Sequence, residues 1–207
     1  MRITDLTVNL SDSTPVFPGD PKLEIKEIGS IEKDNYLEHQ LCLPTHIGTH
    51  IDAPAHMIRG GKLLSDYPIS KFIGDGVLID ARDGYGVIDL KQSVSPGSII
   101  LFNTGWDKKS SSPEYFTDFE QMPEPVADWL IHQKPKMIGL DVSGPDFDPF
   151  PIHKKLLAED ILIIENLTNL NQLQGLDFEV IALPIKLELD GAPARVIARV
   201  NKLLEPF

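Results

Sequence analysis

The chain of 207 residues is long enough to enclose a hydrophobic core, and its 42% hydrophobic and 24% charged residues are ordinary for a globular protein. Its 31 acidic residues outnumber the 19 lysines and arginines, and the resulting formal charge of −12 argues against nucleic acid and anionic membranes as partners. The single cysteine, Cys42, excludes an intramolecular disulfide, and its apolar neighbours predict a small buried side chain. We expect one domain over residues 1–207.

The N-terminal segment Met1–Leu10 alternates between polar and apolar residues, which predicts a strand. No basic stretch precedes a long apolar run there, and no apolar run in the sequence approaches the length of a membrane span. We therefore expect a soluble cytoplasmic protein that does not interact with membranes.

Short apolar segments bounded by glycine, proline or aspartate follow along the chain, and they predict buried strands. They are Lys22–Ile28, Gly76–Asp80, Ser98–Asn103, Met137–Asp141, Ile161–Glu165 and Val180–Pro184. Two helices are predicted among them, at Pro123–Lys134 and at His153–Ala158. The order strand, helix, strand between Ile99 and Ile164 favours an α/β layer with further β structure packed nearby.

The segment 44–56, PTHIGTHIDAPAH, contains three of the six histidines together with one aspartate. Its prolines, glycine and β-branched residues disfavour a helix and predict an extended strand. In that conformation His46, His50 and Asp52 share one face, while the β-branched residues on the opposite face pack in the core. Gly48 would lie between the two imidazoles and leave room for an ion. Two imidazoles and one carboxylate suit a divalent metal.

Further candidates lie outside that strand face. His56 follows Pro54, and the spacing leaves open whether it is a fourth ligand or a general base. Glu165 ends the apolar run Ile161–Ile164, where a buried carboxylate requires a cation. His153 begins the short helix before that run and can project toward the same place. The alternative for the first cluster is a solvated surface strand, which the flanking isoleucines and prolines argue against.

The sequence THIGTHIDAPAH resembles the H-x-G-T-H-x-D-A-P-x-H signature of the cyclase-like metal-dependent hydrolases, a family that includes bacterial kynurenine formamidases and isatin hydrolases. The resemblance continues through segments 14–20 (TPVFPGD), 141–148, 153–170 and 183–195 (LPIKLELDGAPAR). It implies a swivelling β/β/α domain, an α/β fold that is rich in β structure and has short helices. It also implies a dimer or larger homo-oligomer, in which the N-terminal segment helps to shape a neighbouring pocket.

The resemblance implies a metal site with named ligands. His46, His50 and Asp52 would bind a first divalent ion. Asp52 would also bridge to a possible second ion held by His153 and Glu165, so that the chain carries one or two ions. Imidazole and carboxylate donors favour Zn²⁺, with Mn²⁺ as the alternative.

The resemblance also implies that His56 is the proton donor and acceptor. Phe17 stands where formamidases place a tryptophan that stacks on the substrate, so we expect Phe17 to bind the substrate; the alternative is an ordinary core position. The stretch Asp141–His153 is shorter than its counterpart in formamidases. Because both departures fall where the pocket is expected, the identity of the substrate stays open.

We therefore predict a metal-dependent hydrolase that cleaves a non-peptide C–N bond in an aryl formamide or a cyclic amide. A lyase or dehydratase, or a lactone hydrolase, would need an overlapping set of residues at the same metal. A non-catalytic protein that binds metal or a small ligand is another class, and His56 argues against it because such a protein needs no base. The expected partners are a small-molecule substrate and further copies of the chain, as a dimer or tetramer.

Overall fold

The structure is a computed structural model that describes residues 2–203, so residue 1 and residues 204–207 of the predicted domain lie outside the described part. The strands are β1 (Arg2–Asp5), β2 (Glu24–Gly29), β3 (Glu38–Cys42), β4 (His50–Asp52), β5 (Ile73–Asp80), β6 (Ile99–Asn103), β7 (Met137–Leu140), β8 (Leu162–Glu165), β9 (Leu176–Pro184) and β10 (Gly191–Leu203). The α-helices are α1 (Ile31–Asp34), α2 (Glu124–Gln133) and α3 (Pro151–Ala158).

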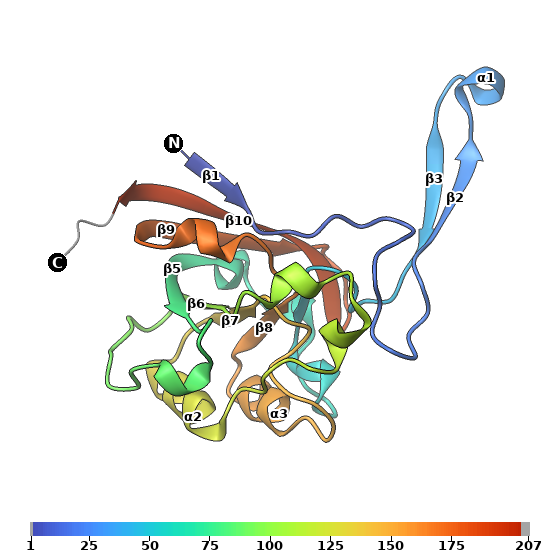
Figure 1. Ribbon diagram of the computed structural model, residues 1–207. Helices are drawn as coiled ribbons and strands as arrows, with labels where there is room; N and C mark the ends of the chain where they lie inside the picture. Colours follow the sequence, from blue (N-terminus) through green and yellow to red (C-terminus); the bar gives the residue numbers. More distant parts are fainter. Residues whose placement is uncertain (1, 204–207) are drawn as a thin grey trace.

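One large sheet forms the body of the molecule, with its strands in the order β1-β10-β4-β8-β7-β6-β5-β9 (Figure 1). An additional pairing between β9 and β10 closes all of these strands except β1 into a barrel. The strands from β5 to β8 are parallel neighbours, and α2 and α3 connect the last three of them in chain order. This β-rich architecture with few, short helices confirms the predicted fold class.

Two hydrophobic clusters lie on opposite faces of the parallel strands. Ile99 and Leu101 of β6 belong to the cluster that includes buried residues of β9 and β10. Ile100 and Phe102 belong to the other cluster, which includes α2 and α3 residues such as Leu130. Successive side chains of a strand point to opposite faces, so β6 contributes to both clusters. No helix within residues 2–203 is long and apolar enough to cross a membrane.

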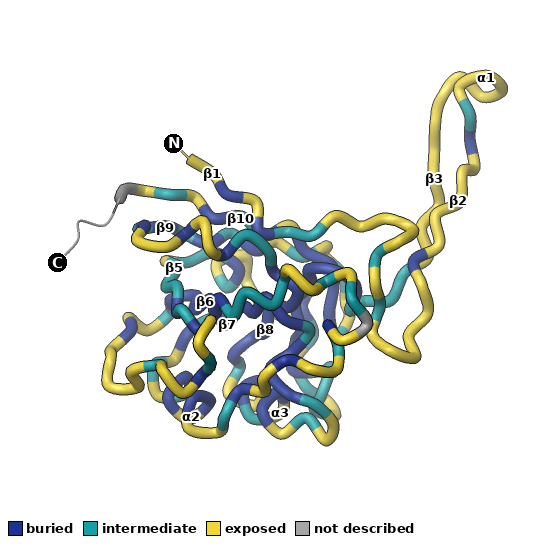
Figure 2. The backbone as a smooth tube through the Cα atoms, in the orientation of Figure 1, coloured by how far each residue is buried: buried dark blue, intermediate teal, exposed yellow. Residues whose placement is uncertain are grey.

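Strands β2 and β3, with α1 at their turn, form a separate two-stranded sheet that projects from the body (Figure 1). Figure 2 shows that this hairpin is exposed along most of its length. The predicted burial of the strand Lys22–Ile28 is therefore wrong, and so is that of Cys42, which is exposed at the end of β3. Leu23, just before β2, is buried, but Ile25, Ile28 and Leu41 lie on the hairpin, where the described body packs no core against them.

Candidate metal centre

Strand β4 lies at the middle of the predicted site. It is held between β8 and β10, with His50 opposite Glu165. Ile47 and Ile51 are buried, as predicted for the face opposite the histidines. The strand covers only His50–Asp52, because the backbone turns at Gly48, whose φ is 56°. The prediction of one continuous strand through this segment is therefore wrong before His50.

Gly48 does not provide the predicted room for an ion. A Cβ atom built there would meet Cδ2 of Leu10 at 2.5 Å, so the space beside Gly48 belongs to that leucine. The left-handed backbone at Gly48 also strains any residue that carries a side chain. The turn instead directs the Gly48 carbonyl toward His50, whose Nδ1 donates a hydrogen bond to it at 2.8 Å.

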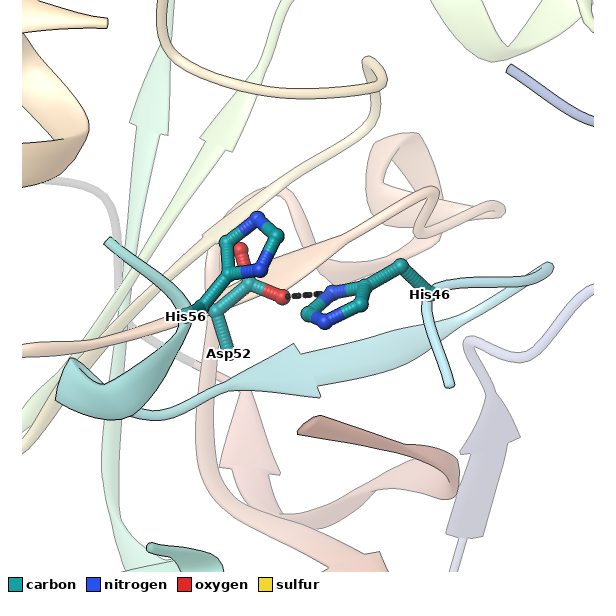
Figure 3. A group of neighbouring side chains, drawn as sticks. All are labelled: His46, Asp52 and His56. Atoms are coloured by element: carbon teal, nitrogen blue, oxygen red, sulfur yellow. Dashed lines mark hydrogen bonds and ion pairs between the residues drawn. The ribbon is translucent and has the colours of Figure 1, made fainter. Parts of the chain in front are cut away.

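The predicted ligands converge on Asp52, which is 1% exposed. One atom each from His46, Asp52 and His56 lies within 4.8 Å of the other two. A second such group consists of His50, Asp52 and Glu165. Figure 3 shows the first group, in which Nδ1 of His46 donates a hydrogen bond to Oδ1 of Asp52 at 2.7 Å. A single buried carboxylate therefore belongs to both groups.

His50 provides a test of whether a cation fits. Because its Nδ1 donates to the Gly48 carbonyl, its Nε2 is the nitrogen that is left to bind an ion. Nε2 is buried without a hydrogen-bond partner among residues 2–203, and it lies 3.3 Å from Oδ1 of Asp52 and 3.4 Å from Oε2 of Glu165. An unpartnered buried nitrogen destabilises the fold, whereas a cation would satisfy it together with the two carboxylates. The donor set fits a divalent ion.

His153 reaches the same carboxylates from helix α3. Its Nε2 donates a hydrogen bond to Oε1 of Glu165 at 3.0 Å and lies 4.0 Å from Oδ2 of Asp52. Its Nδ1 donates to Asp146, a buried residue to which the sequence analysis assigns no role. A Cβ atom at Gly144 would meet Cε1 of His153 at 2.9 Å, so glycine allows the loop that carries Asp146 to pass this close.

His56 ends the 3₁₀ turn Pro54–His56 and stacks on His46, with the ring centroids 3.8 Å apart. Its Nδ1 lies 3.4 Å from Oδ2 of Asp190. The same oxygen accepts a hydrogen bond from Nε2 of His46 at 2.9 Å. Asp190 is a site residue that the sequence analysis does not identify; its only signal there is its position within the segment LELDGAPAR.

Neighbouring carboxylates raise the pKa values of three histidines, His46, His50 and His153, in the metal-free protein. Burial lowers the pKa of His46, but its carboxylate partners outweigh burial and raise it to about 9. Burial likewise lowers the pKa of His153, whereas hydrogen bonds to carboxylates raise it to about 10. Burial favours the neutral form of Asp52, yet His46 and His50 hold its pKa well below the ordinary value. Without a cation, protons on the histidines therefore balance the buried carboxylates.

A cavity of about 380 Å³ opens onto these groups. Aromatic side chains line much of it: Phe17, Phe116, Phe119, Phe147 and Phe150. Phe17 is 40% exposed and packs edge-to-face on Phe116, with the ring centroids 6.1 Å apart. Its exposure excludes a core position. Binding of the substrate by Phe17 stays a prediction.

Residues 4–147 match the family model Cyclase, which is described as "Putative cyclase". The chain belongs to the cyclase family. This cyclase-family protein is 35% identical over 204 residues to Uncharacterized protein MJ0783 of Methanocaldococcus jannaschii, covering 96% of this chain and 99% of that one. It is 28% identical over 207 residues to a kynurenine formamidase of Erythrobacter litoralis, covering 96% of this chain and 94% of that enzyme.

A solved structure shares the fold of the cyclase-family protein. It is an isatin hydrolase bound to the product analogue thioisatinate, and its TM-score is 0.82 at 22% sequence identity. The match covers 95% of this chain and 91% of that one.

Proposed function

We propose that this protein is a metal-dependent hydrolase that cleaves a non-peptide C–N bond in an aryl formamide or a cyclic amide. The observation that carries this proposal is the buried Asp52 carboxylate, which two groups of potential ligand atoms share beside an aromatic-lined cavity. The relative named kynurenine formamidase supports the same chemistry.

The proposed ligands for one or two divalent ions are His46, His50, Asp52, His153 and Glu165. The unpartnered Nε2 of His50 supports this assignment, because two carboxylates flank it at contact distance. When bound, a divalent ion polarises a carbonyl group and favours the ionisation of water near neutral pH. Imidazole and carboxylate donors suit Zn²⁺, and a carboxylate-rich site also suits Mn²⁺.

His56 is the proposed proton donor and acceptor. It lines the cavity, and its side chain is 27% exposed, so reactants in the cavity can reach it. Since Nδ1 faces Asp190, Nε2 is the nitrogen that remains for proton transfer. An imidazole at this position takes the proton of the attacking water and returns it to the leaving nitrogen. Phe17 and Phe116 provide an apolar wall against which an aromatic substrate packs.

We also propose that residues 1–207 act as one domain and assemble into a dimer or a larger homo-oligomer. The pairing of β1 with β10 supports a single domain, because it brings the first and the last strand of the described chain into one sheet. The projecting hairpin supports assembly, since a lone two-stranded sheet is marginally stable in water. On it, Ile25 and Leu41 are cross-strand partners that are 38% and 58% exposed. A cytoplasmic location stays a prediction.

The experiment that tests the proposed function measures hydrolysis by the purified protein together with its metal content. Formanilide is the aryl formamide probe, isatin the cyclic amide probe, and an aliphatic lactone the comparison substrate. We expect at least one amide to be hydrolysed, with turnover lost on chelation and restored by Zn²⁺ or Mn²⁺. Protein that carries stoichiometric metal but hydrolyses neither amide would contradict the proposal.

A further inference from the structure

Asn166 connects a buried tyrosine to the candidate metal centre. Its Oδ1 accepts a hydrogen bond from the Tyr115 hydroxyl at 2.9 Å, and its Nδ2 donates one to the Gly48 carbonyl at 2.9 Å. The same carbonyl accepts the Nδ1–H group of His50 at 2.8 Å. Three successive hydrogen bonds therefore connect Tyr115 to His50.

This series of hydrogen bonds has a definite direction. The Gly48 carbonyl oxygen can only accept, so Nδ1 of His50 carries a hydrogen and Nε2 is the nitrogen directed to a metal. A flipped Asn166 amide would place Oδ1 against that carbonyl, with two acceptors facing each other. In the observed orientation Oδ1 instead accepts a hydrogen bond from the Tyr115 hydroxyl. Burial raises the pKa of Tyr115 well above its ordinary value, so that hydroxyl stays protonated.

The backbone of Asn166 keeps its side chain in place. Its φ is 56°, a left-handed conformation that asparagine adopts more readily than most residues. Its carbonyl accepts a hydrogen bond from Oγ1 of Thr49 at 2.7 Å, and its N–H donates to the Val142 carbonyl at 3.0 Å. Asn166 is 8% exposed, and each of its polar groups has a protein partner.

We infer that Asn166 is a positioning residue that fixes the tautomer and orientation of His50 through the Gly48 carbonyl, while Tyr115 holds the Asn166 amide. The inference rests on the proposed function, because it concerns the proposed ligand His50. Asn166 acts through His50 and does not itself hold the ion. Outer hydrogen-bond partners of metal-binding histidines typically change metal affinity by about 10- to 100-fold.

The test compares Zn²⁺ dissociation constants of the metal-free full-length protein and its variants, measured by competition with a chromophoric chelator. Asn166→Gly removes the side chain and tolerates the left-handed backbone. We expect it to weaken Zn²⁺ binding by about 10- to 100-fold. Tyr115→Phe keeps the ring and the Asn166 amide, and it should weaken binding in the same direction by a smaller factor.

Absorption spectra of the Co²⁺-loaded proteins give a second measurement. Both variants should shift the spectrum relative to wild type, because the orientation of His50 toward the ion changes. The matched control is Tyr85→Phe, since Tyr85 is buried and its hydroxyl has no hydrogen-bond partner among the described residues. This control should leave the dissociation constant and the spectrum unchanged.

The possible outcomes separate this inference from the proposed function. Unchanged Zn²⁺ affinity and Co²⁺ spectra in Asn166→Gly and Tyr115→Phe, with lower melting temperatures, would overturn the inference, because the hydrogen bonds would then serve only the fold. Wild-type protein that binds no Zn²⁺ would overturn the proposed function as well. Weaker binding in both variants, with the Tyr85→Phe control unchanged, supports the positioning role.

Discussion

Oδ2 of Asp190 lies 2.9 Å from Nε2 of His46, on the opposite side of the ring from the nitrogen that donates to Asp52. Both nitrogens of this imidazole therefore face carboxylates, and in the metal-free protein both carry a hydrogen. An ion that binds either nitrogen has to displace a proton, which couples metal binding to pH.

The metal-free protein is expected to lose stability as the pH rises from about 6.5 to about 10. The folded pKa values of His46 and His153 are about 9 and about 10, both above the ordinary 6.5. A group with a raised pKa stabilises the fold fully below its unfolded pKa and loses this contribution as the pH passes its folded pKa. Melting temperatures measured in chelator between pH 6 and pH 10 check this; a flat or rising profile would contradict it.

Removing either of two proposed central ligands should abolish stoichiometric metal. His50→Ala deletes the unpartnered nitrogen, and Asp52→Ala deletes the carboxylate that both groups share. Elemental analysis of the purified variants is expected to find little metal, and activity assays are expected to find no amide hydrolysis. His132→Ala, at an exposed position on α2, is the control and should keep the wild-type metal content. Wild-type metal content in both site variants would show that the ion binds elsewhere.

The variant His56→Ala distinguishes a role of His56 as a base from a role as a metal ligand. The test is needed because His56 is also one of the residues that could hold an ion together with His46 and Asp52. If His56 acts as general acid and base, its loss should lower kcat by about 10²- to 10⁴-fold while the metal content stays near that of wild type. The measurement pairs steady-state kinetics with elemental analysis. Loss of metal in this variant would instead make His56 a ligand and require another base.

Phe17→Ala tests the aromatic preference of the cavity. Because Phe17 is 40% exposed, its removal should leave the melting temperature nearly unchanged. Aromatic pairs contribute about 0.5 to 1.5 kcal/mol beyond area burial, so kcat/KM on an aryl formamide should fall by roughly 2- to 10-fold. An aliphatic lactone is the comparison substrate and should show little change. Equal losses on both substrates would remove the support for stacking.

The hairpin should determine the oligomeric state. Ile25 and Leu41 face each other across β2 and β3, so the double variant Ile25→Lys, Leu41→Glu replaces an exposed apolar pair with an ion pair. Light scattering after size exclusion is expected to detect an oligomer for wild type and a monomer for this variant. Ile69→Lys is the control, because Ile69 is 67% exposed outside the hairpin. An unchanged mass for the double variant would place the interface elsewhere.

The parallel strands could be predicted from the sequence, whereas the last strand could not. Strands β7 and β8 are covered on both faces, so they are continuous apolar runs with clear ends. In β10 the buried positions are mostly small, among them Ala194 and Ala198, and they alternate with Arg195 and Arg199. Alanine is a weak strand former, so this alternation does not stand out until β4 and β9 are seen beside it.

The candidate ligands could be named from one short motif and a resemblance, but their neighbours could not. Asp190 lies 144 positions from His46, and Asn166 lies 118 positions from Gly48. No spacing rule relates residues that far apart, because only the pairing of β4 with β10 and β8 brings them together. The role expected for Gly48 was wrong for a related reason: strand periodicity predicts which face a residue lies on, but it does not predict where a strand begins.

The pairing of β4 with β10 has a consequence for how the protein acquires its ion. Residues Gly191–Pro193 pair with His50–Asp52, so one side of the metal centre is built from a late part of the chain. Synthesis proceeds from the N-terminus, and the histidine motif leaves the ribosome well before the strand that flanks it. A nascent chain that ends before β10 has the ligands but lacks the wall that holds β4. The candidate metal centre is therefore complete only after β10 has been synthesised and has paired with β4.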